Sequence, residues 1–101
     1  GAMNIAAVPV PSDADLESFI TATAAGIRGF TVSSRGTFDL RAAASCPMAT
    51  VRYAVIEGRP IVQRYVLVPG GICLIATVAA TDEQALDRTL GPVLATFRFA
   101  S

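Results

Sequence analysis

The stretch MATVRYAVIEGRPIVQRYVLVPGGICLIATVAA, residues 48–80, decides the fold of this chain. Its three apolar segments are rich in Val, Ile, Tyr and Thr, the residue types that fit a pleated strand. They are separated by EGRP at 57–60 and by PGG at 69–71, where glycine allows positive φ and proline is tolerated before a strand. Because both connections are too short for a crossover, neighbouring strands must be antiparallel. The stretch therefore predicts a three-strand meander.

Alternation of side chains along these strands predicts two apolar faces. One face would carry Val51, Tyr53, Val55, Val62, Val66, Cys73 and Ile75. The other would carry Ile56, Ile61, Tyr65, Leu67, Ile72, Leu74 and Val78. A sheet with one face in water alternates more cleanly between apolar and polar residues. We therefore expect that both faces are covered within the chain, or that one is kept for a partner. The simplest hairpin registers place Val66 opposite both Cys73 and Val51.

The segments before the meander predict an edge strand, a helix and two short strands. Segment 4–11 is short and apolar, and its two prolines are typical of an edge strand. Ser12 is a good N-cap, and the acidic residues at 13, 15 and 17 suit the start of a helix. Apolar residues at helical spacing follow, so we expect a helix over about 13–27. The loosely alternating segment 30–40 predicts two short strands, with one bent strand as the alternative.

A second helix is predicted after the meander. Thr81 and Gln84 have the spacing of a capping box. The buried stripe of this helix would consist of Ala85, Leu86, Leu90, Val93, Leu94 and Phe97. Pro92 should kink or end the helix, because it removes a backbone hydrogen bond. The expected fold class is therefore α+β: an antiparallel sheet with a three-strand C-terminal meander, packed with two helices.

Composition and charge argue against several classes of function. A chain of 101 residues forms a single domain, and its formal charge is balanced. All eight basic residues are scattered Arg, whereas a nucleic-acid footprint needs clustered positive charge. No apolar run approaches the ~18 residues of a membrane span. Arg without Lys, together with abundant Ala, is typical of a GC-rich genome such as that of an actinobacterium.

The residues that usually carry catalysis are missing from this sequence. There is no His, no G-x-S-x-G motif, no phosphate loop and no metal-ligand cluster. We therefore expect no enzyme activity, no catalytic residue, no metal site and no cofactor. Cys46 and Cys73 are expected to be two buried thiols. A disulfide between them is the alternative, and it would need residues 43–47 to fold back.

A pattern of turn and small residues runs through the C-terminal half of the chain. It consists of Pro47, Ala49, Tyr53, Gly58, Gln63, Gly70, Gly71, Thr77, Ala79, Thr96 and Phe97. With this pattern and the preceding helix, residues 10–99 resemble the PsbP-like superfamily, in particular DcrB-like proteins and the LpqN/LpqT lipoproteins. Members of that superfamily usually carry further N-terminal strands. Because residues 1–3 have the form of a cloning scar, we expect 4–101 to be one α+β domain, either a truncated or a shortened PsbP-like domain.

The resemblance implies a non-catalytic function. The superfamily includes photosystem extrinsic subunits, envelope lipoproteins and adaptor chaperones that hold apolar helices of type VI secretion effectors. We therefore expect a non-catalytic protein-binding module, a bacterial adaptor associated with the envelope or with secretion. The cell envelope is favoured over the cytoplasm, and membrane attachment would come only from a lipid anchor outside this sequence. The alternative is a small carrier that binds a lipid or another apolar ligand between sheet and helices.

An apolar sheet with unpaired edges offers strand addition or a groove for a helix. The expected partner is another protein, or a second copy in a dimer, bound through a sheet face or edge. The candidate partner-binding residues are Arg52, Tyr53, Arg64 and Tyr65, because aromatic residues and Arg dominate interface energetics. Each also has a structural reading: the tyrosines would be core residues, and the arginines would lie near an edge and reach water.

Overall fold

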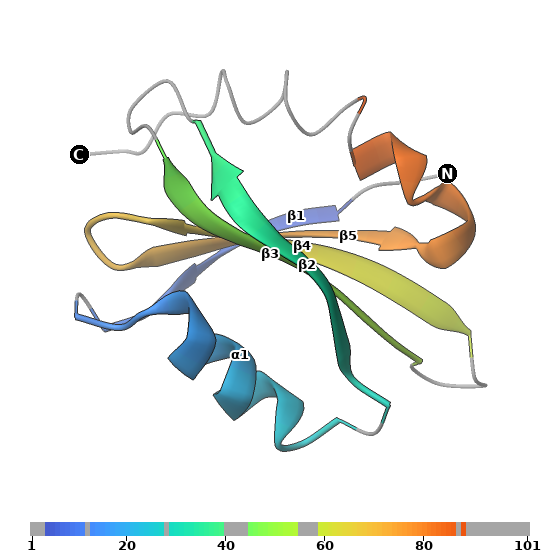
Figure 1. The fold of residues 1–101 in the computed structure, drawn as a ribbon, viewed down its shortest axis with the longest axis horizontal. Helices are drawn as coiled ribbons and strands as arrows, with labels where there is room; N and C mark the ends of the chain where they lie inside the picture. Colours follow the sequence, from blue (N-terminus) through green and yellow to red (C-terminus); the bar gives the residue numbers. More distant parts are fainter. Residues whose placement is uncertain are drawn as a thin grey trace.

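Five antiparallel strands form one sheet in the structure, a computed structural model that describes residues 4–11, 13–27, 29–39, 45–54, 59–86 and 88. The elements are β1 (Asn4–Pro9), α1 (Leu16–Ala24), β2 (Thr31–Phe38), β3 (Cys46–Ala54), β4 (Pro60–Val68), β5 (Ile72–Ala79) and the 3-10 helix η2 (Ala80–Asp82). The strand order is β1-β5-β4-β3-β2, and every neighbouring pair is antiparallel. In Figure 1, α1 lies on one face of the sheet and η2 follows β5.

The predicted α+β fold with two packed helices is wrong. Within the described residues a five-strand antiparallel sheet dominates, and α1 is the single α-helix that packs on it. After β5 the chain makes η2, and one irregular helical turn follows at 84–86. Thr81 lies inside η2, whose start has no side-chain cap, so the capping box predicted there is not formed. Leu90, Val93, Leu94 and Phe97 of the predicted stripe, and the kink expected at Pro92, lie outside the described residues.

Residues 31–38 form one bent strand, the alternative that we kept, rather than the two short strands that we predicted. β2 pairs with β3 from Thr31↔Arg52 to Phe38↔Cys46, with a shift in register between Val32 and Ser34. The extra residue, Ser33, bends the strand as a β-bulge does. Gly36 pairs with Met48 instead of making a turn, because the ladder with β3 continues through it.

Helix α1 is shorter than predicted and begins at another cap. Asp15 has an extended backbone, and its Oδ1 accepts a hydrogen bond of 2.7 Å from the backbone N–H of Ser18. This bond satisfies one of the donors that every helix start leaves unpaired. Ser12, the predicted cap, lies outside the described residues. Several acceptors in succession could have capped this helix, and the sequence does not rank them.

The turn between β4 and β5 sets which side chains share a face. Val68 pairs with Ile72 across a three-residue turn in which Gly70 has φ +103° and Gly71 has φ +96°. Val66 therefore lies opposite Leu74, not Cys73. On its other side Val66 lies opposite Met48, three residues from the Val51 that we predicted. Because a slip by an odd number of residues turns a strand over, our sorting of the two faces was wrong.

Each face of the sheet carries its own apolar cluster. The α1 face holds Leu16, Ile20, Ala49, Val51, Tyr65 and Cys73. The opposite face holds Cys46, Val62, Val66, Val68, Leu74, Ala76, Val78 and Leu86. Both cysteines are buried thiols, as predicted. They lie on opposite faces of the sheet, which explains why no disulfide joins them.

Candidate functional site

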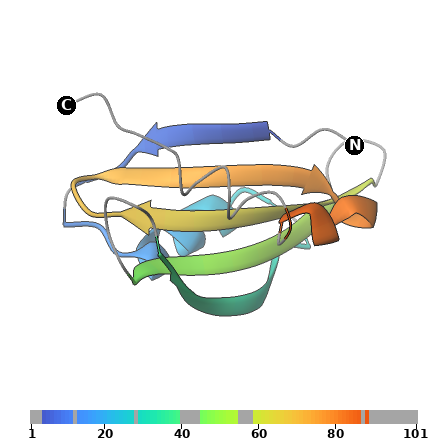
Figure 2. The ribbon, with the colours of Figure 1, turned by 90° about the horizontal axis from the view of Figure 1, so that it is seen from above.

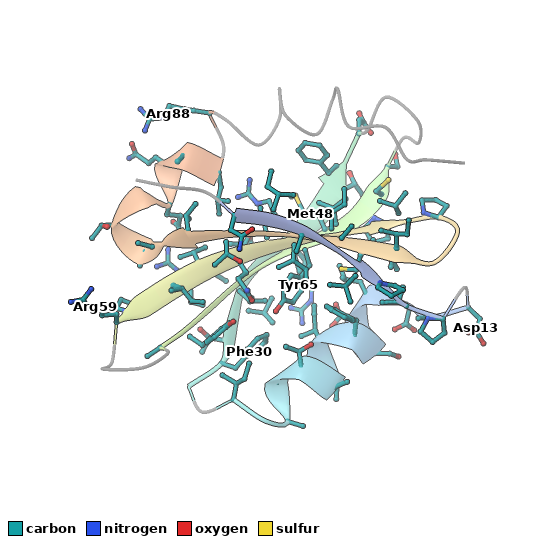
Figure 3. All side chains as sticks on the ribbon, turned by 180° about the vertical axis from the view of Figure 1, so that it is seen from behind. Asp13, Phe30, Met48, Arg59, Tyr65 and Arg88 are labelled. Carbon is teal, nitrogen blue, oxygen red and sulfur yellow. The ribbon has the colours of Figure 1, made fainter. Side chains whose placement is uncertain are left out.

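The four candidate binding residues do not form one surface. Arg52 pairs with Val62 and Arg64 pairs with Thr50, which places both arginines on the face opposite α1. Tyr65 and Tyr53 project to the α1 face. The sheet itself separates the two arginines from the two tyrosines. Figure 3 shows Tyr65 and Phe30 on the α1 side of the sheet and Met48 on the other side.

Tyr65 is part of the core. Its side chain is 1% exposed, and its ring meets that of Phe19 edge-on at 5.3 Å between centroids. The Tyr65 hydroxyl donates a hydrogen bond of 2.9 Å to Gln63 Oε1, and Gln63 Nε2 donates one of 3.0 Å to Thr77 Oγ1. Burial raises the pKa of Tyr65 well above its usual range. The residue therefore ties α1 to β4 and β5, and no partner can reach its ring without opening the core.

Tyr53 is more accessible than Tyr65. It is half-buried, and its ring stacks on Phe30 with centroids 5.7 Å apart and 20° between the ring planes. Partial burial raises the pKa of its hydroxyl. This pair shields one end of the α1 face and leaves some aromatic surface in water.

The two arginines make contacts within the chain. The exposed side chain of Arg52 forms an ion pair with Glu83, which lies just after η2. Arg64 is half-buried, and its Nε donates a hydrogen bond of 3.1 Å to Thr50 Oγ1 of β3. Both contacts join neighbouring segments of the chain, so each arginine already has a structural role within the chain.

The outer edge of β1, which no described strand covers, is a site feature that our residue choice missed. The backbone N–H of Val10 donates to the Gly71 carbonyl at 2.9 Å, in register with the ladder between β1 and β5. Alternate residues of a strand turn their N–H and C=O groups to the same side. The backbone N–H and C=O groups of the even-numbered residues of β1 therefore point toward β5. Those of Ile5, Ala7 and Pro9 point away from the sheet, except that Pro9 has no N–H. No described strand pairs with these outward groups.

The position of Pro9 fits this orientation. Proline has no N–H, so it is accepted in a sheet where that group would point away from the ladder. The outward donors of β1 are then the N–H groups of Ile5 and Ala7, and the outward acceptors are their carbonyls and that of Pro9. The sequence signal for an edge strand was correct. It did not reveal which neighbour this strand would have or which of its groups would stay unpaired.

The second edge of the sheet, β2, is protected. Its bulge at Ser33 interrupts the ladder, and Ser33 Oγ donates a hydrogen bond to the Thr50 carbonyl. Arg35 adds a charged side chain, which is paired with Glu17 of α1 at 2.9 Å. Bulges and charges are the usual means by which edge strands avoid pairing with other chains. β1, with the sequence NIAAVP, has no charge.

A strip of the α1 face next to β1 is not covered by the helix. Figure 2 shows α1 behind β3 and β4, with β1 at the far edge of the sheet. Ala6 and Val8 of β1 pair with Ile75 and Cys73 of β5, so they project to the α1 face. Ala6 is exposed, and Val8 and Ile75 are half-buried. We call the outward backbone groups of β1, together with Ala6, Val8 and Ile75, the β1 margin.

Two shallow hollows lie at the start of α1. One, of about 340 Å³, is lined by Asp15, Leu16, Glu17, Arg35, Gly36, Pro47 and Met48. The other, of about 230 Å³, is lined by Pro11, Ala14, Pro47, Leu67, Val68, Pro69, Gly70 and Gly71. The charges of the first already have partners, because Glu17 pairs with Arg35 and Asp15 caps α1. The Arg35 hydrogen bond lowers the pKa of Glu17. The charged side chains of the first hollow are therefore already engaged within the chain.

The described residues contain neither a cluster of metal ligands nor a helix suited to a membrane. No group of three or more acidic, Cys or His side chains there is placed to hold a metal ion. None of the helices in the same residues has the length and apolarity needed to cross a membrane.

Comparison with known proteins gives a fold relationship and no family. No family model and no curated protein matches the sequence. The structure is similar to the crystal structure of PA94 from Pseudomonas aeruginosa, described as a protein of unknown function and a suggested regulator. The TM-score is 0.59 at 14% sequence identity, over 99% of this chain and 84% of that chain. At this identity the likeness shows a shared fold alone.

Proposed function

We propose that this chain is a non-catalytic protein-binding module that docks a partner at the β1 margin. The observation that carries the proposal is the outward row of backbone groups at Ile5, Ala7 and Pro9 on an uncharged edge strand. A strand that adds to such an edge gains main-chain hydrogen bonds, and its side chains gain apolar contacts on the face beside it. Here that face offers Ala6 and Val8.

The two thiols support a non-catalytic role. Burial raises the pKa of Cys73 to about 11. Burial and the nearby charge of Asp39 raise the pKa of Cys46. A nucleophilic cysteine needs a lowered pKa and a base, and the sequence contains no His to serve as that base.

The narrower role stays a proposal that rests on the resemblance of residues 10–99 to DcrB-like and LpqN/LpqT proteins. In that proposal the module is an adaptor of the bacterial envelope or of a secretion system. Tyr53 and Arg52 are the members of the predicted set whose exposure would let a partner touch them. They lie on opposite faces at one end of β3, so a partner would meet them separately.

Site-specific photocrosslinking in the source cells tests the docking surface. A photoreactive amino acid replaces Ala7 on β1 in one variant and Thr37 on β2 in the other. Both positions are exposed edge residues. We expect protein adducts from position 7 and few from position 37, because among the described strands β1 has an uncharged outer edge and β2 is bulged and charged. Equal labelling at both positions, or labelling at position 37 alone, would rule out the β1 margin as the docking surface.

The carrier function has less support among the described residues. Leu16, Ile20 and Tyr65 fill the layer between α1 and the sheet, and each is at most 6% exposed. An acyl chain in that layer would have to displace them. Native mass spectrometry of the purified protein checks this alternative, since a co-purifying lipid would favour the carrier.

A further inference from the structure

We infer that the strand added at the β1 margin is β1 of a second copy, so that two sheets join across a two-fold axis. This inference rests on the proposed function and names its partner. It is carried by three properties of β1: its lack of charge, the pattern of its outward donors and the position of its proline.

Charge allows two copies of β1 to approach. Residues 4–10 contain no ionisable side chain, so the contact neither repels itself nor removes a charge from water. A partner strand for this edge should be equally uncharged, and a second β1 meets that requirement. β2 does not, because it presents Arg35 and a bulge.

The outward groups fix the pairing. If Ile5 lies opposite Ala7 of the second copy, each N–H of these residues donates to the carbonyl of its opposite residue. The two-fold axis creates the same pair between Ala7 and Ile5 of the second copy. Together the two pairs give four hydrogen bonds and leave no N–H of Ile5 or Ala7 unpaired. The axis then passes between the two copies of Ala6. Pro9 stays outside these pairs, whereas a pairing centred on Ala7 would set Pro9 against Ile5.

This register has two consequences for side chains. Residues directly opposite in an antiparallel pair project to the same face, so both α1 helices lie on one side of the joined sheet. Ala6 faces its own copy across the axis as a non-hydrogen-bonded pair, with Cα atoms about 4.5 Å apart. That separation lies within the range that a disulfide spans.

The size of the contact predicts a reversible dimer. A pair of six-residue strands buries much less than the roughly 1,200–2,000 Å² of a stable interface. In sedimentation equilibrium we therefore expect the mass to rise with protein concentration from 10.5 kDa toward twice that value. A mass that stays at the monomer value up to about 1 mM would overturn the inference. Such a result would mean that the free energy of dimerisation is weaker than ~4 kcal/mol, which corresponds to a Kd above about 1 mM.

A charge swap at the axis tests the register. Ala6→Lys and Ala6→Glu each set two like charges opposite one another, so each variant alone should be monomeric. An equimolar mixture should form a heterodimer at least as well as the original chain. Because the mixture restores association, loss of folding cannot explain the monomers. Thr37→Lys on β2 is the matched control and should leave association unchanged. Ala6 variants that still dimerise alone would overturn the pairing.

Disulfide trapping gives a second readout. Ala6→Cys should form a cross-linked dimer on mild oxidation, and Ala7→Cys should not, because Ala7 lies opposite Ile5. Cross-linking of Ala7→Cys but not of Ala6→Cys would overturn the register. A strictly monomeric chain whose position 7 still labels another protein would refute the second copy and leave the proposed function standing. A monomer without adducts at position 7 would refute both.

Discussion

Tyr65 joins the two layers of the molecule through one ring and one hydroxyl group. The ring fills the space between α1 and the sheet, where it meets Phe19, and the hydroxyl is held by Gln63. Gln63 is held in turn by Thr77, so three neighbouring side chains on β4 and β5 satisfy one another. A polar chain of this kind stabilises a core only while each member keeps its partner.

Replacing Tyr65 by Phe should test this chain of hydrogen bonds. Tyr65→Phe keeps the ring but leaves Gln63 Oε1 without its donor, which should lower the free energy of unfolding by about 1 kcal/mol. Tyr53→Phe is the matched control and should change it less, because no described residue forms a hydrogen bond with the Tyr53 hydroxyl. Urea denaturation of the three proteins measures both effects. An equal loss in both variants would contradict the role given to Gln63.

At the scale of single elements, local hydrogen bonds decide where each one starts and how it pairs. α1 starts at Asp15 because this carboxylate reaches the N–H of Ser18. β4 and β5 take their register from a turn of three residues, in which two glycines adopt positive φ. One further residue in that turn would exchange the side chains of the two faces.

The cap of α1 should make stability depend on pH in the acid range. The hydrogen bond from Ser18 lowers the pKa of Asp15, so folding favours the charged carboxylate. Its contribution is present above the unfolded pKa of about 3.9 and is lost as pH falls through the lower pKa of the folded state. Asp15→Ala should therefore lower Tm at pH 7 and change it little near pH 2. Asp13→Ala, at an exposed residue before the cap, should leave Tm unchanged. Thermal scans across this pH range would contradict the assignment if Asp15→Ala cost as much in acid as at neutrality.

The β4–β5 turn should resist side chains at Gly70. A Cβ there has open space around it, but φ +103° is a conformation that other residues rarely adopt. Gly70→Ala should therefore lower the free energy of unfolding by about 1 kcal/mol or more. Gly26, after the end of α1, also has open space and has no positive φ. Gly26→Ala should be neutral or slightly stabilising, and guanidinium denaturation of both variants would show whether backbone conformation is the cause.

At the scale of the whole molecule, two apolar clusters lie back to back on one sheet. β4 is the central strand of the order, and its side chains enter both clusters. α1 lies behind β3 and β4 and does not extend behind β1 (Figure 2). The two edge strands differ, because β2 is bulged and carries a charged residue. β1 pairs with β5 without a shift in register and is uncharged.

Hydrogen exchange should report this arrangement amide by amide. Amides of β4, paired on both sides, should exchange slowest, because they open only with the whole sheet. Within β1, the amides of Ile5 and Ala7 should exchange fast in dilute solution, and those of Ala6 and Val8 more slowly because they face β5. Raising the protein concentration should protect Ile5 and Ala7 selectively. NMR-detected exchange measures each amide, and slow exchange at Ile5 in a dilute monomer would contradict the orientation of β1.

The sequence by itself determined the three strands of 48–80, the turn at 69–71, the edge character of the N-terminal strand and the buried state of both cysteines. Residues 57–58 of the other predicted turn lie outside the described residues. Apolar segments, glycine and proline restrict the conformation of the residues beside them. Their effect can therefore be predicted without knowing which segment packs against them. Registers, faces and the extent of each helix were decided only in the tertiary structure, because they depend on turn length and on which segments meet. For that reason the sequence could propose Arg52, Tyr53, Arg64 and Tyr65 but could not place them. The backbone groups of β1 that no described strand pairs could be identified only once β5 was known to be its neighbour.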